Sequence, residues 1–169
     1  TAHKATGNTN EAITFYDKVI KINPNSVNAQ FNLGVLFYEQ KELKKAKVFF
    51  KKTTEIQPNY ALAFSNLGNV HAELKEYENA ISSYQKAIEI NPNLVGAHNN
   101  LGLVYRNLND YENAISSYKK AIKIKPEHAG AHHNLALALR ELGKFDLAIQ
   151  SHEMAIKYEP QNSIHYFYL

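Results

Sequence analysis

Residues 76–93 read EYENAISSYQKAIEINPN, and residues 110–127 read DYENAISSYKKAIKIKPE. The second segment is a near-copy of the first, 34 residues further along the chain. The prolines of the chain share this spacing, at Pro24, Pro58, Pro92, Pro126 and Pro160. A fixed period of this length indicates a repeat architecture, in which each unit buries its apolar face only by stacking on its neighbours.

Placing each proline at position 32 of a 34-residue repeat divides the 169-residue chain into similar units. We predict one array over residues 1–169. It consists of a partial repeat at 1–26, full repeats at 27–60, 61–94, 95–128 and 129–162, and the start of a further first helix at 163–169.

Each full repeat has the pattern of two amphipathic helices. In the third full repeat, apolar residues recur with a period near 3.6 at Leu101, Val104, Tyr105 and Leu108, which indicates a first helix. A second helix is indicated by Tyr111, Ala114, Ile115, Tyr118, Ala121, Ile122 and Ile124. We therefore expect nine complete helices and a helical fragment at each end, with Thr1 inside a first helix.

Small residues and prolines indicate how these helices pack and where they end. Position 8 is Gly or Ala and position 20 is Ala, so the two helices of a repeat can approach closely. A large side chain at position 24, usually aromatic, would fill the space between neighbouring repeats. The proline at position 32 stops the second helix because it lacks an N–H and disfavours helix in the residue before it.

The sequence resembles the tetratricopeptide repeat (TPR) family over essentially its whole length. The residues that match in the third full repeat are Leu101, Gly102, Tyr105, Ala114, Tyr118, Ala121 and Pro126. The resemblance implies an all-α fold, a right-handed TPR α-solenoid of stacked helix-turn-helix hairpins. It also implies that the first helix of each repeat lines the concave side.

Composition and motifs argue against an enzyme. The chain has no cysteine, which excludes a thiolate nucleophile and a Cys-ligated metal. Its seven glycines form no phosphate-binding loop. His98, His128 and His132 lack the further ligands of a zinc site, so we interpret the first and last as packing residues and His128 as part of a polar turn. We predict no catalytic residue, no metal and no cofactor.

Charge and hydropathy limit the classes of partner that the chain is expected to bind. The formal net charge is +3, and the four full repeats alternate at +3, −2, +2 and −1. This alternation is unlike the continuous basic track of a nucleic-acid-binding protein, and the lysines around 41–52 are best interpreted as a solvated face. The sequence has no apolar stretch near the ~20 residues that span a bilayer, and no visible secretory or transit peptide. We expect no nucleic-acid or membrane partner and a cytoplasmic location, although the absence of cysteine does not fix the compartment.

Position 6 is asparagine in every full repeat, at Asn32, Asn66, Asn100 and Asn134. The apolar positions leave this side of the first helix facing the groove. An amide side chain can donate to a peptide C=O and accept from its N–H. Amides spaced about 10 Å apart, the distance between packed helices, could hold an extended peptide. The pattern resembles the asparagine ladder in the TPR superhelix of O-linked N-acetylglucosamine transferase. The alternative is that these asparagines bond only to neighbouring helices.

Other groove-facing residues would set the preference of the site: Phe31, Asn69, Asn99, Arg106, His133 and Arg140. The two arginines favour an acidic segment of the ligand. Chaperone-binding TPR domains hold a terminal carboxylate with lysines at positions 2 and 5. Neither position is lysine in any full repeat of this chain, so we predict no clamp of that type.

These observations favour a non-enzymatic interaction scaffold that binds an extended peptide or partner segment. One alternative is a substrate-selecting domain of a larger glycosyltransferase-like enzyme. Another is a self-assembly scaffold, a possible homo-oligomer formed through the apolar end Ile164–Leu169.

Overall fold

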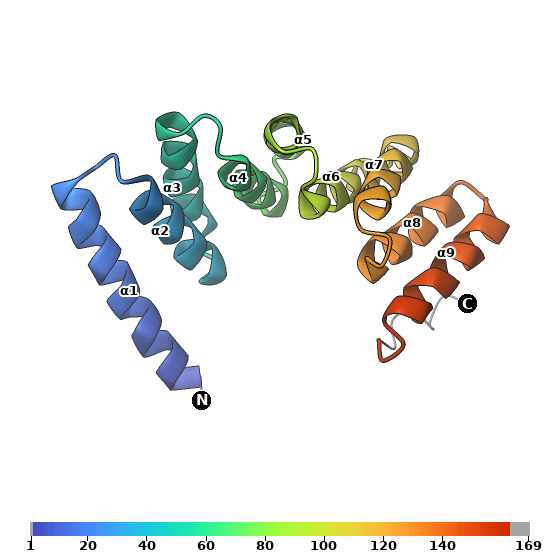
Figure 1. The fold of residues 1–169 in the computed structure, drawn as a ribbon, viewed down its shortest axis with the longest axis horizontal. Helices are drawn as coiled ribbons and strands as arrows, with labels where there is room; N and C mark the ends of the chain where they lie inside the picture. Colours follow the sequence, from blue (N-terminus) through green and yellow to red (C-terminus); the bar gives the residue numbers. More distant parts are fainter. Residues whose placement is uncertain (1, 163–169) are drawn as a thin grey trace. The chain divides into compact units, whose positions relative to one another are not determined.

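The computed structural model describes the backbone of residues 2–162 and the side chains of residues 9–162. Within that range the chain forms nine α-helices and no strand (Figure 1). They are α1 (Ala2–Ile22), α2 (Val27–Glu39), α3 (Leu43–Ile56), α4 (Ala61–Glu73), α5 (Tyr77–Ile90), α6 (Val95–Asn107), α7 (Tyr111–Ile124), α8 (Ala129–Glu141) and α9 (Phe145–Tyr158). The predicted all-α fold of helical hairpins is confirmed.

The helix bounds follow the 34-residue period. First helices (α2, α4, α6 and α8) occupy repeat positions 1–13, and second helices (α3, α5, α7 and α9) occupy positions 17–30. Each second helix ends two residues before a proline, as the missing N–H requires.

A left-handed residue ends each first helix. The φ angles at position 15 are +61° for Lys41, +60° for Lys75, +59° for Asn109 and +69° for Gly143. In the first of these turns, Lys41 N–H donates to the Tyr38 carbonyl at 2.9 Å and Glu42 N–H donates to the Phe37 carbonyl at 2.8 Å. This Schellman-type pairing satisfies the last carbonyls of the helix and reverses the chain within three residues.

The N-terminal part of the chain differs from the expectation. A fragment of a first helix, separate from the next helix, was expected there, but α1 runs unbroken from Ala2 to Ile22. The partial repeat lacks a complete first helix to pack on the second, so continued helix hydrogen bonding is favoured over a turn.

The described contacts divide the chain into two compact units, Thr1–Ile90 and Asn91–Leu169. The core of the first unit joins Leu33, Phe37, Ala46 and Phe50 of one repeat to Leu67 and Val70 of the next. The core of the second unit joins Ala114 and Tyr118 to Leu135, Ala136, Ala138, Leu139 and Ala148. In both, the aromatic residue at position 24 belongs to a cluster that extends into the following repeat, as predicted. Leu108, predicted as an apolar core residue, is instead 41% exposed.

Close approach of the two helices depends on the small residue at position 8. A Cβ atom on Gly34, Gly68 or Gly102 would lie 2.7, 2.7 or 2.5 Å from the ring at position 24 of the same repeat. In the fourth full repeat, position 8 is Ala136 and position 24 is the smaller ring of His152. The extra methyl group and the smaller ring therefore occur together.

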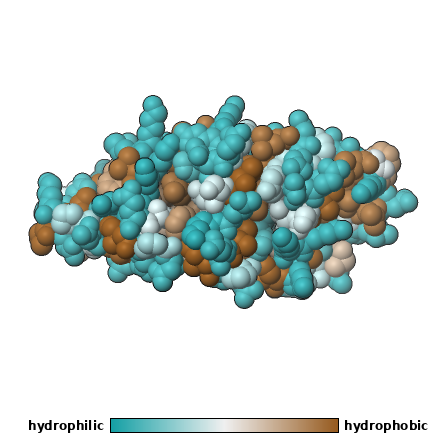
Figure 2. Space-filling view, turned by 90° about the horizontal axis from the view of Figure 1, so that it is seen from above, coloured by the Kyte–Doolittle hydropathy of each residue, from teal (hydrophilic) through white to brown (hydrophobic). Residues whose placement is uncertain are grey.

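Hydrophilic residues occupy much of the face in Figure 2, and hydrophobic residues appear between them in separate patches. Exposed apolar side chains include Phe15, Val48, Leu62 and Phe145. Scattered apolar residues of this kind are ordinary on protein surfaces.

Candidate functional site

Position 4 ties three of the four first helices to the preceding proline turn; in α4 the residue at this position is Phe64, whose side chain has no hydrogen-bond donor. The side chain of Gln30 donates to the Pro24 carbonyl at 2.9 Å, that of His98 to the Pro92 carbonyl at 2.9 Å, and that of His132 to the Pro126 carbonyl at 2.8 Å.

His128 has a different role: its Nδ1 accepts from the Ala131 N–H at 3.1 Å and caps α8. Among the described residues, no group of three or more His, Cys, Asp and Glu side chains could hold a metal ion. These three histidines therefore have roles in the turns, and the hydrogen bonds were not apparent from sequence.

In the first unit, the position-6 residues Asn32 and Asn66 lie half-buried on α2 and α4. The Asn69 amide, also half-buried, donates to Asn66 Oδ1 at 3.3 Å. The Tyr84 hydroxyl of α5 donates to Asn69 Oδ1 at 2.7 Å. Asn66 and Asn69 are thus brought together on α4, and the tyrosine behind them fixes the orientation of Asn69.

In the second unit, three asparagines form a chain of hydrogen bonds from α8 to α6. Asn134 Nδ2 donates to Asn99 Oδ1 at 3.0 Å, and Asn99 Nδ2 donates to Asn100 Oδ1 at 3.2 Å. All three side chains are half-buried. Asn134 uses one of its two amide protons in this chain, and an amide has two donors and an acceptor oxygen. After bonding to Asn99, the amide of Asn134 therefore still has one N–H and its oxygen to offer a ligand.

The other predicted residues have mainly packing or ionic contacts. The half-buried ring of Phe31 lies 5.7 Å from that of Phe50 and 5.0 Å from that of Tyr60. His133 meets the ring of His152 edge-on at 5.2 Å. Arg140 is exposed and lies 3.5 Å from Glu141. None of these contacts brings the two predicted arginines together.

Arg106 and Tyr118 bring two buried donors into the second unit. Neither Nη1 of Arg106 nor the Tyr118 hydroxyl has a hydrogen-bond partner among the described residues. Burial raises the pKa of Tyr118 to about 12, and the nearby positive charge of Arg106 opposes part of that rise. The hydroxyl is therefore protonated at neutral pH and able to donate.

Ionic contacts in the first unit join neighbouring repeats. Glu73 of α4 accepts from the Tyr38 hydroxyl and pairs with Lys41 Nζ at 3.0 Å. Glu76, which precedes α5, pairs with Lys47 Nζ at 2.8 Å and lies 2.5 Å from His71 Nδ1. The hydrogen bond from Tyr38 lowers the pKa of Glu73, and the one from Lys47 lowers the pKa of Glu76. These contacts give acidic residues of the second full repeat a structural role.

The paired helices and their proline-anchored turns define a helical repeat protein. Sequence models described as TPR repeat match residues 2–41 and 68–109, and models described as tetratricopeptide repeat match residues 27–60, 95–128 and 117–150. The chain belongs to the tetratricopeptide repeat family.

Solved structures of similar fold agree with this assignment. The chain shares 30% sequence identity with the protein in the crystal structure of MamA. The two structures match with a TM-score of 0.87, over 94% of this chain and 92% of that one. PilF of Pseudomonas aeruginosa is 23% identical, with a TM-score of 0.84, over 97% and 75% of the two chains. YrrB, described as a TPR protein with an unusual peptide-binding site, is 22% identical, with a TM-score of 0.81, over 97% and 84%.

No curated protein sequence matches the chain. None of the helices in the described range combines the length and apolarity needed to cross a bilayer. The predicted oligomer contact, Ile164–Leu169, lies outside the described residues.

Proposed function

We propose that the protein is a non-enzymatic interaction scaffold that binds an extended polypeptide segment through the amides of its first helices. The observation that carries the proposal is the recurrence of half-buried asparagine at position 6 of every full repeat. Such side chains are within reach of a ligand, and each can pair with both the N–H and the C=O of a peptide unit. This is the binding mode of the asparagine ladder that the sequence resembles.

Hydrogen bonds among the asparagines support this role. Asn99 links Asn100 to Asn134 across two repeats, which restricts the rotation of all three amides. A side chain already held in place loses less entropy when it binds, so the bonds between repeats favour peptide recognition. YrrB, a fold neighbour, is described as a peptide-binding TPR protein, which agrees with a polypeptide ligand.

Arg106 supplies the preference for acidic segments. Its buried Nη1 has no protein acceptor among the described residues, which is costly, and an oxygen atom of a ligand would satisfy it. Arg106 is half-buried, so part of the side chain reaches the surface and can move with a ligand. A carboxylate is the natural partner of a guanidinium group. Polypeptide is favoured over nucleic acid because the charge alternates from repeat to repeat.

The test is to change Asn66, Asn100 and Asn134 together to Ala. Captured partners of the wild-type array are identified by pull-down, and the affinity of the bound segment is then measured for both proteins. Losing several main-chain hydrogen bonds should weaken binding at least tenfold. The helical content measured by circular dichroism should not change.

The matched control is the double variant Asn59→Ala and Asn79→Ala, which removes exposed asparagines that lie outside the first helices. This control should bind like wild type. Equal affinity of the triple variant and the wild type would show that the asparagines bond only within the array.

A further inference from the structure

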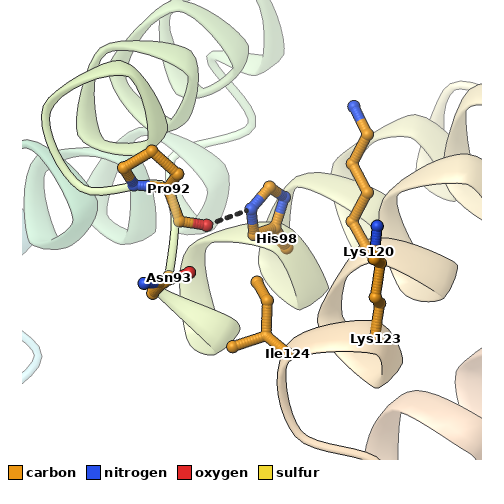
Figure 3. Close-up of a pocket in the computed structure, with 6 residues that line it drawn as sticks. All are labelled: Pro92, Asn93, His98, Lys120, Lys123 and Ile124. Carbon is orange, nitrogen blue, oxygen red and sulfur yellow. Dashed lines mark hydrogen bonds between the residues drawn. The ribbon is translucent and has the colours of Figure 1, made fainter.

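A cavity of about 700 Å³ lies in the second unit, beside the turn that precedes α6. Figure 3 shows Pro92 and Asn93 on one side of it and Lys120 and Lys123 of α7 on the other, with His98 and Ile124 between them; these six residues line the cavity. None of the asparagines of position 6 is among them. The cavity is therefore a candidate site separate from the one proposed above.

One wall of the cavity is fixed by a hydrogen bond. His98 is 5% exposed, and its Nε2 lies 2.9 Å from the Pro92 carbonyl oxygen (Figure 3). A carbonyl oxygen only accepts, so Nε2 bears the proton. This bond holds the proline turn against α6, and Pro92 and Ile124 give the cavity an apolar side.

The opposite wall has two positive charges where the first two full repeats have an ion pair. Positions 26 and 29 are Lys52 and Glu55 in the first full repeat, 3.7 Å apart, and Lys86 and Glu89 in the second, 3.0 Å apart. In the third full repeat both positions are lysine, at Lys120 and Lys123. Like charges one helical turn apart repel each other.

No counter-charge for these two lysines comes from the rest of the described chain. Neither Lys120 nor Lys123 makes an ion pair within residues 9–162. The two lysines are three residues apart on α7, so their side chains share one helix face and a single carboxylate can approach both of them. The cavity thus combines a site for an anion with an apolar surface beside it.

We propose that this cavity binds an acidic segment of a partner polypeptide, with a Glu or Asp carboxylate between Lys120 and Lys123 and an adjacent apolar side chain against Pro92 and Ile124. A polypeptide fits better than a free anion, because a free anion would leave the apolar side unused. The two ammonium groups supply the attraction, and the rigid His98–Pro92 wall supplies the shape.

The experiment measures fluorescence anisotropy of two labelled peptides with the 169-residue chain. The first peptide is acetyl-Ala-Leu-Glu-Glu-Leu-Ala-amide, and the second has Gln in place of both Glu residues. Charge-assisted contacts should make the acidic peptide bind about tenfold more tightly than the neutral one. Equal affinity for the two peptides, or no binding of the acidic one, would overturn the proposal.

Lys123→Glu is the decisive variant, because it places at positions 26 and 29 the Lys–Glu pair found in the first two full repeats. The fold should be kept or stabilised in thermal melts, while affinity for the acidic peptide falls about tenfold. Lys119→Glu is the matched control: it makes the same charge change on an exposed residue of α7 that does not line the cavity. It should retain most of the affinity.

Two further outcomes would contradict the proposed acidic-peptide site. Equal losses in Lys119→Glu and Lys123→Glu would mean that the peptide senses only the general charge of α7, against the proposal. Displacement of the peptide by inorganic phosphate, but not by chloride at equal ionic strength, would assign the site to a free anion instead. Lys123→Glu should reduce affinity for the acidic peptide about tenfold in the triple asparagine variant as it does in the wild type, which separates this proposal from the function proposed above.

Discussion

Two tyrosines at position 24 show how one neighbouring residue changes the energetics of a repeat. Tyr84 and Tyr118 are 1% and 0% exposed, and both rings cover a glycine. The Tyr84 hydroxyl donates to Asn69, but the third full repeat has Leu103 at that position. The Tyr118 hydroxyl therefore has no acceptor among the described residues. A buried polar group without a partner costs about 1–3 kcal/mol.

Removing each hydroxyl should consequently have opposite effects on stability. We expect Tyr84→Phe to lower the free energy of unfolding by about 1 kcal/mol, because it breaks a hydrogen bond and leaves Asn69 Oδ1 without that donor. We expect Tyr118→Phe to be neutral or to stabilise by up to about 1 kcal/mol. Urea denaturation of the two variants measures both values. If Tyr118→Phe destabilised as much as Tyr84→Phe, a bound water molecule would have to satisfy the hydroxyl.

The sequence predicted which residues lie on the first helices, but not which of them meet. The period of 3.6 placed the position-6 asparagines on the face opposite the apolar residues. It did not predict that Asn134 would bond to Asn99 of the preceding repeat, because that contact depends on the rotation and spacing of two helices. Nor did it distinguish Tyr118 from Tyr84, since the hydroxyl partner comes from a different helix.

At the level of helices, the ends were more predictable than the turns between them. Proline removes a donor wherever it occurs, so the second helices end as expected. The left-handed turns were not predicted, because two of the four residues are Lys41 and Lys75, which do not favour positive φ, and only Asn109 and Gly143 do. A left-handed L-residue costs about 1–2 kcal/mol. The two hydrogen bonds that close each turn, and the packing of both helices, offset this cost.

The ion pairs between helices of the first unit should make stability depend on pH. The pKa values of Glu73 and Glu76 are lowered in the folded state, so both carboxylates stabilise the fold above their unfolded pKa of about 4.3. This contribution is lost as the pH falls through the lowered folded-state pKa values. We expect Glu73→Gln combined with Glu76→Gln to reduce the urea midpoint at pH 7.

The difference between this double variant and the wild type should shrink below about pH 4, because the wild-type carboxylates are then protonated as well. Glu78→Gln, a change to an exposed residue of α5, serves as the control and should unfold like wild type at each pH. A difference from wild type that stayed constant down to pH 2 would show that packing, and not charge, is responsible.

At the level of the whole molecule, we expect a destabilised unit to unfold without the other unit. Repeat proteins are held together by contacts within a repeat and with the next one. The contacts of this chain form two units, Thr1–Ile90 and Asn91–Leu169, and each has its own apolar cluster. Each unit also has a glycine at position 8 under a buried tyrosine, at Gly68 and Gly102. The same substitution can therefore be made once in each unit.

Gly102→Ala should destabilise the second unit and leave most of the first unit protected. The new Cβ would lie 2.5 Å from Tyr118 Cε1, and overpacking of a buried contact costs about 1–3 kcal/mol. Hydrogen exchange measured by mass spectrometry should show faster exchange in α6 to α9 and nearly unchanged exchange in α2 to α4. Gly68→Ala, with a predicted contact of 2.7 Å to Tyr84, should reverse the pattern.

A second change tests whether the clash itself is the cause. Adding Tyr118→His to Gly102→Ala reproduces the combination of Ala136 and His152 found in the fourth full repeat, so part of the lost protection should return. If both glycine variants accelerated exchange equally along α2 to α9, the chain would be unfolding as a single cooperative body. The two units would then differ in their contacts but not in their stability.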